Sequence, residues 1–251
     1  MLNLCLLATL LCRAEIDNNT VGVRAQFDRA NRLYDQQKYT KAREIYEEIV
    51  RTGMRDPVVL YNLGNSCARM GDGGASVLYY SRALRLAPRD SDIRENLSRL
   101  EPPINKSKTF FLLKPLAWVE NHMSLDEWTL LCSLFFIFGF TASGFRLLFR
   151  TEKIKHLFRT LIILSGIFLL LSGCFLSLKI YEELVVQTAI VMKPDTLAHS
   201  GPGSQFEELY KLPAGTSVRI ISKPRKGWVR IRLKDGRSAY LPLTSIRNLN
   251  T

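Results

Sequence analysis

The chain has 251 residues and a formal charge of +12, from 35 Lys and Arg against 23 Asp and Glu. This length allows one or two small domains. The basic residues are scattered and do not form a stripe with interleaved aromatic residues, so the charge argues against a nucleic-acid-binding protein.

The sequence also lacks the residue patterns of an enzyme active site. Of the five cysteines, only Cys67 lies in a predicted soluble domain, and the three histidines fall in three different segments. A cysteine nucleophile needs a histidine base beside it. The sequence contains no phosphate-binding glycine loop, zinc-spaced pair or nucleophile elbow. We therefore expect a protein that is not an enzyme and uses no cofactor or metal.

Residues 1–14, MLNLCLLATLLCRA, form an apolar segment that resembles a secretory signal peptide. The segment ends at a small residue, Ala14, after which a signal peptidase would cut, although no basic residues stand in front of its apolar core. This pattern predicts export of the residues that follow.

Residues 23–100 contain an internal repeat. The stretches YTKAREIYEEI and GGASVLYYSRA align at a spacing of 34 residues, and each is followed by a turn with proline. The residues that match are Ala42, Tyr46 and Ile49 in the first stretch and Ser76, Tyr80 and Ala83 in the second. A period of 34 with a helix, a turn and a helix resembles the tetratricopeptide repeat family. The resemblance implies an all-α domain.

Two repeats are few for such an array, which needs about three units to bury its faces. Asp90–Leu100 is predicted to form a terminal capping helix. We expect further cover from a membrane-proximal helix or from a partner. Most of the repeat tyrosines should lie in the core. The residues that we place in a peptide-binding groove are Tyr34, Tyr61, Asn62 and Asn65.

Residues 101–124 are interpreted as a linker and an interfacial helix. The stretch TFFLLKPLAWVENHM is apolar but too short to span a bilayer, which is typical of a helix in the headgroup region. Ser124 and Glu127 have the spacing of a capping box, so a new helix should begin there. Trp128 is expected to anchor that helix at the membrane interface.

Residues 125–149 and 160–180 are the two predicted transmembrane helices. Within them, the runs Trp128–Phe145 and Thr160–Leu178 carry no charged side chain. As α-helices these runs measure about 27–29 Å, close to the hydrocarbon core of about 30 Å. The alternative is a buried hydrophobic hairpin in a soluble protein. A membrane hairpin is favoured, because a soluble two-layer core does not need two uncharged runs of this length.

Residues 150–159 form a basic loop that determines the predicted topology. The cations at this turn are Arg146, Arg150, Lys153, Lys155 and Arg159. Short loops rich in Lys and Arg stay in the cytoplasm, whereas acidic residues flank the outer ends of both spans. The domains on both sides of the hairpin should therefore lie on the periplasmic side of a bacterial inner membrane.

Residues 185–251 change to a period of two. Gly227–Lys234 alternates apolar and basic side chains and then turns at Asp235–Gly236, which predicts a hairpin in a small all-β barrel. The segment resembles bacterial SH3-like domains in Ser200-Gly201-Pro202, in Pro213-Ala214-Gly215-Thr216 and in Trp228. The resemblance places Trp228 in the core, whereas His199 and Ala239-Tyr240 depart from the family pattern.

Four cations of this barrel form a candidate basic face: Arg230, Arg232, Lys234 and Arg237. A row of this kind is usually a solvated strand face. The alternative is a contact with a polyanion such as a cell-wall polymer or a lipid headgroup.

In this order the segments resemble the BatE-type proteins of the bacterial aerotolerance (Bat) operon. The resemblance implies an inner-membrane scaffold that works beside von Willebrand A-domain membrane proteins and a MoxR-type ATPase. We therefore expect a multidomain membrane protein with an all-α tetratricopeptide repeat domain, a transmembrane helical hairpin and a small all-β SH3-like barrel. It would bind a protein partner without catalysis. The alternatives are a cell-wall-binding anchor or sensor acting through the barrel, and assembly through the hairpin itself.

Overall fold

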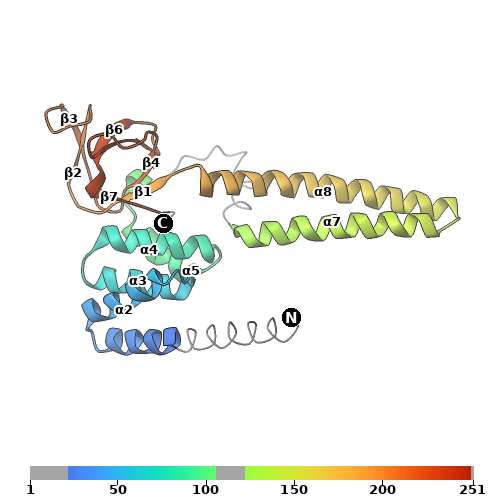
Figure 1. Ribbon diagram of the computed structural model, residues 1–251, viewed down its shortest axis with the longest axis horizontal. Helices are drawn as coiled ribbons and strands as arrows, with labels where there is room; N and C mark the ends of the chain where they lie inside the picture. Colours follow the sequence, from blue (N-terminus) through green and yellow to red (C-terminus); the bar gives the residue numbers. More distant parts are fainter. Residues whose placement is uncertain (1–21, 106–121, 250–251) are drawn as a thin grey trace, which may run out of the picture.

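The computed structural model describes residues 22–105 and 122–249. Figure 1 shows a helical domain, a long hairpin of two helices and a small curved sheet. The helical domain and the sheet lie together at one end of the hairpin, which projects away from both. The signal-like segment and most of the predicted interfacial helix lie outside the described residues.

The helical domain begins with a helix over residues 22–35, followed by α2 (Tyr39–Arg51), α3 (Pro57–Arg69), α4 (Gly73–Leu86) and α5 (Ser91–Leu100). Aspartates mark where three of these helices start. The Asp56 side chain accepts hydrogen bonds from first-turn amides of α3, and Asp72 and Asp90 do the same for α4 and α5. These helix starts are therefore encoded by local cap residues.

The positions that repeat in the sequence form the core of this domain. All six matched residues are buried: Ala42, Tyr46, Ile49, Ser76, Tyr80 and Ala83. Gly64 of α3 lies against the ring of Tyr80, and a Cβ atom on Gly64 would be only 2.7 Å from Cδ1 of that ring. The close approach of α3 and α4 therefore depends on a residue without a side chain.

The outer side of α4 is covered by the sheet. Val77 and Leu78 of α4 form one buried cluster with Ile190 and Leu249 from the C-terminal segment. The sequence led us to expect cover from a membrane-proximal helix or a partner, whereas the structure places the sheet on this side of α4; most of the predicted interfacial helix lies outside the described residues. Ile190 does not belong to the hydrophobic core of the sheet. It is buried because it packs against α4.

The hairpin consists of α7 (Leu125–Leu148) and α8 (Glu152–Leu184). The predicted capping box is confirmed, because the Glu127 amide donates to Ser124 Oγ at 3.3 Å and the Ser124 amide donates to Glu127 Oε2 at 2.9 Å. Both helices are long and apolar enough to cross a membrane. Only 6% of the most apolar stretch of α7 and 11% of that of α8 is buried, which argues against a soluble hydrophobic core.

The second helix of the hairpin begins earlier than predicted. It starts at Glu152, so Lys153, Lys155 and Arg159 lie in its first turns and not in a loop over residues 150–159. No proline or glycine interrupts this stretch, and Glu152 pairs with Lys155 at 2.8 Å one turn along the helix. The cations still gather at the end of the hairpin that is remote from both other parts.

Small residues bring α7 and α8 together. A Cβ atom at Gly139 would lie 2.9 Å from Oγ of Ser165, and this hydroxyl donates to the carbonyl oxygen of Phe135 at 2.6 Å. By contrast, Cβ atoms at Gly144 and Gly166 would meet no atom within 4 Å. Only some of the small residues therefore serve the packing of the two helices.

The sheet has seven antiparallel strands in the spatial order β3-β2-β6-β5-β4-β1-β7. The strands are β1 (Thr188–Val191), β2 (Thr196–His199), β3 (Glu208–Leu212), β4 (Ser217–Ile220), β5 (Trp228–Leu233), β6 (Ser238–Pro242) and β7 (Ile246–Asn248). In β5, Val229, Ile231 and Leu233 are buried, whereas Arg230 and Arg232 are exposed. The predicted period of two is thereby confirmed.

Two tryptophans lie differently from the positions predicted for them. Trp128 is only 4% exposed and stacks on Phe175 at 4.9 Å, so it packs inside the hairpin and does not face outward as an anchor. Trp228 is half-buried on the outer face of β5, where its ring meets His199 edge-on at 5.0 Å. Strand alternation explains this, since the next residue, Val229, points into the core.

Candidate functional site

Three of the four groove residues predicted from the sequence, Tyr61, Asn62 and Asn65, belong to a network of asparagine and tyrosine side chains. The Tyr46 hydroxyl donates to Asn31 Oδ1 at 2.5 Å. In the next unit, the Tyr80 hydroxyl donates to Asn65 Oδ1 at 2.6 Å. Both members of the second pair follow those of the first by the same 34 residues. The repeat therefore conserves a hydrogen bond as well as buried apolar positions.

A second set of bonds connects the helices that carry these asparagines. Asn62 Nδ2 donates to Asn31 Oδ1 at 3.1 Å. Asn96 Nδ2 donates to Asn65 Oδ1 at 3.4 Å and to the Tyr61 hydroxyl at 2.9 Å. The network thus links the helix over residues 22–35 with α3 and α5.

The network uses only one polar group of Asn62 and one of Asn65. In the hydrogen bonds described for their side chains, Asn62 uses its amide nitrogen and Asn65 uses its amide oxygen. The oxygen of Asn62 and the nitrogen of Asn65 take no part in these hydrogen bonds. Both residues are half-buried, so they are held in place yet accessible.

Tyr34 lies one turn after Asn31 on the first helix. It is half-buried, and its ring meets that of Tyr39 edge-on at 5.2 Å. The Tyr34 hydroxyl also raises the pKa of the Arg69 guanidinium above its ordinary value by hydrogen bonding. The structure therefore groups Tyr61, Asn62 and Asn65 on α3 and places Tyr34 on the neighbouring helix.

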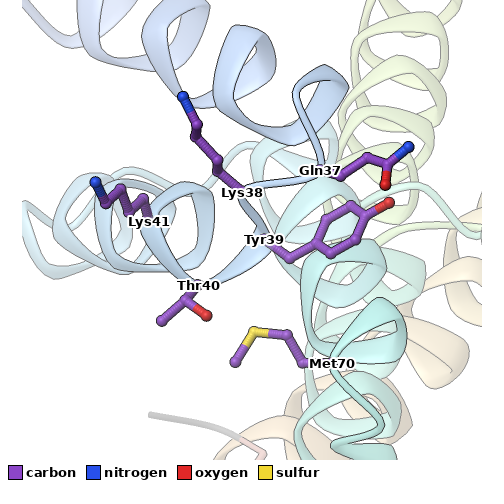
Figure 2. A pocket seen from close by; sticks show the side chains of 6 residues that line it. All are labelled: Gln37, Lys38, Tyr39, Thr40, Lys41 and Met70. Carbon is purple, nitrogen blue, oxygen red and sulfur yellow. The ribbon is translucent and has the colours of Figure 1, made fainter.

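Figure 2 shows a pocket of about 310 Å³ beside the turn that precedes α2. It is lined by Gln37, Lys38, Tyr39, Thr40, Lys41 and Met70. The lining holds no carboxylate, cysteine or histidine, and the side chains of Lys38 and Lys41 point away from Met70. The pocket lining therefore offers no carboxylate, thiolate or imidazole ligand for a metal ion.

The thiol and metal-ligating residues do not assemble a reactive site in the part of the chain that the structure describes. No three His, Cys, Asp or Glu side chains are grouped there as metal ligands. Cys67 is fully buried, and burial raises the pKa of its thiol to about 12. It therefore stays protonated at neutral pH and is a packing residue.

The predicted basic face of the sheet divides into two parts. Lys234 pairs with Glu101 of the helical domain at 3.8 Å. Arg237 pairs with Asp235 at 2.7 Å, and its guanidinium lies 4.6 Å from the ring centre of Tyr210. These two cations already have partners within the chain. Arg230 and Arg232 remain on the exposed side of β5.

The structure adds a residue to this face that the sequence analysis missed. Arg219 of β4 is exposed and is the register partner of Arg232 in β5. The clue was the stretch Ser217–Ile220, in which a lone arginine alternates with apolar residues as in β5. Arg219 and Arg232 are neighbours only in the register in which β4 pairs with β5.

The sheet contacts the helical domain through the ends of β1 and β7, the first and last strands in the chain. A Cβ atom at Gly74 of α4 would lie 2.5 Å from the backbone oxygen of Met192, which directly follows β1. Arg82 of α4 donates to the carbonyl oxygens of Asn248 at 2.7 Å and Leu249 at 3.2 Å. Burial in this contact lowers the pKa of the Arg82 guanidinium.

A comparison with protein families matches the family described as "Bacterial SH3 domain" to residues 198–244. This segment of the chain is a bacterial SH3-like domain. The match includes β3 to β6 and excludes β1 and β7, the strands nearest α4. It indicates a protein-binding or cell-wall-binding role for the sheet. A comparison with curated proteins finds no match to this chain.

Proposed function

We propose that this chain is a non-enzymatic scaffold of the bacterial inner membrane whose helical domain is a tetratricopeptide repeat domain that binds a protein partner. The observation that carries the proposal is the recurrence of the Tyr46–Asn31 hydrogen bond as Tyr80–Asn65 in the next unit. A repeated polar network with unused amide groups suits the main chain of an extended peptide.

The anchoring part of the proposal rests on the hairpin. Its exposed apolar side chains need a nonpolar environment, and the length of each helix suits a bilayer. The cations around Arg150 and Lys153 favour a cytoplasmic turn. Both the helical domain and the SH3-like domain then lie on the periplasmic side.

The order of domains supports a place in a Bat-type envelope complex. By that resemblance, we propose that the partner is a von Willebrand A-domain membrane protein associated with a MoxR-type ATPase system. The scaffold would present its repeat groove to the periplasmic part of such a partner, while the hairpin keeps it at the membrane.

The test is a comparison of partner recovery from native membranes. The full chain is purified in mild detergent as wild type, as Asn62→Ala and as the control Glu44→Ala, which alters an exposed residue of α2. We expect the wild type and the control to recover the same partner, and Asn62→Ala to weaken its binding about tenfold, or about 1.4 kcal/mol. Equal recovery by all three proteins, with unchanged melting temperatures, would overturn the groove assignment.

The second candidate function is cell-wall anchoring or sensing through the SH3-like domain, a role that the family match suggests alongside protein binding. Deleting this domain would expose Val77 and Leu78 of α4, so point variants give a cleaner test. Retention of the full chain on purified cell walls, lost in Arg230→Glu but not in Asn62→Ala, would support this alternative.

A further inference from the structure

The SH3-like domain starts close to the end of the second apolar helix. α8 ends at Leu184 and β1 begins at Thr188, a connection that spans at most about 14 Å when fully extended. Thr188 is the register partner of Arg219 in β4, and Arg219 is the register partner of Arg232 in β5. Since neighbouring strands lie about 4.8 Å apart, both arginines are within two strands of the point where the sheet begins.

The position of α8 places this corner of the sheet at the membrane surface. The uncharged run of α8 ends at Leu178, and Lys179–Leu184 continue the helix for about 9 Å. A headgroup layer adds about 5–8 Å outside the hydrocarbon core. α8 therefore ends near the outer edge of the headgroups. In Figure 1, β1 and β4 lie on the side of the sheet nearest α8, and β2 and β3 lie on the far side.

The two arginines repel each other in the isolated chain. Like charges directly opposite each other in an antiparallel pair are destabilising. Both side chains are exposed, and neither forms an ion pair with an acidic residue in the part of the chain that the structure describes. An external anion between the two guanidinium groups would remove this repulsion.

We infer that Arg219 and Arg232 bind the phosphates of anionic phospholipid headgroups and so hold the outer face of β4 and β5 against the bilayer. The inference rests on the proposed membrane span. Guanidinium groups bind phosphate with two parallel hydrogen bonds, and the end of α8 brings this part of the sheet next to the phosphates of the periplasmic leaflet. The surface is an extra membrane contact of the SH3-like domain, separate from the repeat groove.

Position distinguishes lipid from a cell-wall polymer as the ligand. A site for a cell-wall polymer would not need to lie at the corner of the sheet nearest α8, whereas a site for lipid headgroups must lie there. Lys193 and Lys211 are also exposed but lie elsewhere, beyond the far end of β1 and on the edge strand β3. They form a matched control, because their reversal changes the charge by the same amount at a distance from the proposed membrane surface.

The experiment counts the lipids that stay bound to the full chain. The wild type, the double variant Arg219→Glu/Arg232→Glu and the control Lys193→Glu/Lys211→Glu are inserted into nanodiscs of equal phosphatidylglycerol and phosphatidylcholine. The retained lipids are identified by native mass spectrometry. We expect the ratio of phosphatidylglycerol to phosphatidylcholine to fall at least twofold in the arginine variant and to stay unchanged in the control. The neutral variant Arg219→Gln/Arg232→Gln should give an intermediate fall.

Each other outcome has a defined meaning. Equal ratios in all folded, inserted proteins would overturn the lipid contact and leave the membrane span intact. Failure of every protein to insert would overturn the span itself, and the inference with it. Unchanged lipid ratios together with arginine-dependent binding to purified cell walls would assign the surface to a wall polymer and overturn the lipid proposal.

Discussion

Gly74 of α4 and Met192 at the end of β1 approach so closely that a methyl group on Gly74 would lie 2.5 Å from the Met192 carbonyl oxygen. The nearest atoms belong to the backbone of Met192, so they cannot swing aside as a flexible side chain would. Together with the bonds from Arg82 to the last strand, this contact makes the sheet, through the ends of β1 and β7, the outer cover of the helical domain.

Replacing Gly74 with Ala should therefore push the sheet away from α4. We expect a loss of stability of about 1–3 kcal/mol, the usual cost of overpacking a buried contact, and faster proteolysis between the domains. The matched control is the adjacent residue, because a Cβ atom at Gly73 meets nothing within 4 Å. Gly73→Ala should be neutral or stabilising by up to about 1 kcal/mol. Equal melting temperatures for the two variants in detergent would contradict the described interface.

The sequence could predict the elements of this chain better than their association. Caps such as Ser124, the buried repeat of Tyr46 and Tyr80, and the alternation of β5 are local signals, and the structure agrees with each of them. The docking of Ile190 on Val77 depends on two segments that are far apart in the chain. One clue was available, because α4 is apolar on more sides than a helix with one buried face requires.

The candidate binding residues show the same limit. Asn62 and Asn65 were found because they lie on one face of one helix, but their bonds to Asn31 and Asn96 needed the packed structure. The basic face of the SH3-like domain was only partly predicted. Alternation placed Arg230 and Arg232 outside, whereas finding their neighbour Arg219 requires the register between β4 and β5, which involves two separate segments of the chain.

The repulsion between Arg219 and Arg232 leads to a prediction about stability. The single substitution Arg232→Glu turns a pair of like charges into a pair of opposite charges at directly opposite strand positions. We expect it to stabilise the SH3-like domain by about 0.2–1 kcal/mol at low salt, measured by thermal unfolding of the full chain in neutral detergent. A gain that persists in 1 M salt, or a loss of stability, would show that electrostatic repulsion is not the cause.

The raised pKa of the Tyr46 hydroxyl should make the free energy of unfolding depend on pH in the alkaline range. Burial raises the pKa of its hydroxyl to about 12, compared with about 10 in an unfolded chain. The folded state keeps this proton where the unfolded state releases it, so the stabilisation is complete below pH 10 and is lost as the pH rises through 12. Since one pKa unit corresponds to about 1.4 kcal/mol, the loss of stability over that window should reach up to about 3 kcal/mol.

The variant Tyr46→Phe isolates this effect. It should lower stability by about 1 kcal/mol at pH 7, because the hydrogen bond to Asn31 is lost. Between pH 10 and 12 its deficit relative to the wild type should shrink, because phenylalanine has no proton to release. A deficit that stays constant up to pH 12 would contradict the proposed titration.

The close approach of Gly139 to Ser165 leads to a prediction about which face of α7 packs against α8. Gly139→Leu should separate α7 from α8, because the added side chain meets Ser165 at a crossing that leaves no room for a Cβ atom. Gly144→Leu is the control, since that position is open. Cysteines introduced at Phe135 and Phe168, whose rings stack at 5.2 Å, should be joined less readily by a short bifunctional thiol cross-linker in the first variant only. Equal cross-linking in both would disprove the assigned face.

The central claim is that the hairpin crosses the membrane with its cationic turn in the cytoplasm, and that the helical domain and the SH3-like domain share the opposite side. The most direct measurement fuses two reporters in turn to the C-terminus of the full chain, alkaline phosphatase, which is active only outside the cytoplasm, and a green fluorescent protein that fluoresces only inside it. We expect an active phosphatase and a dark fluorescent fusion. A fluorescent C-terminal fusion with inactive phosphatase would contradict the account.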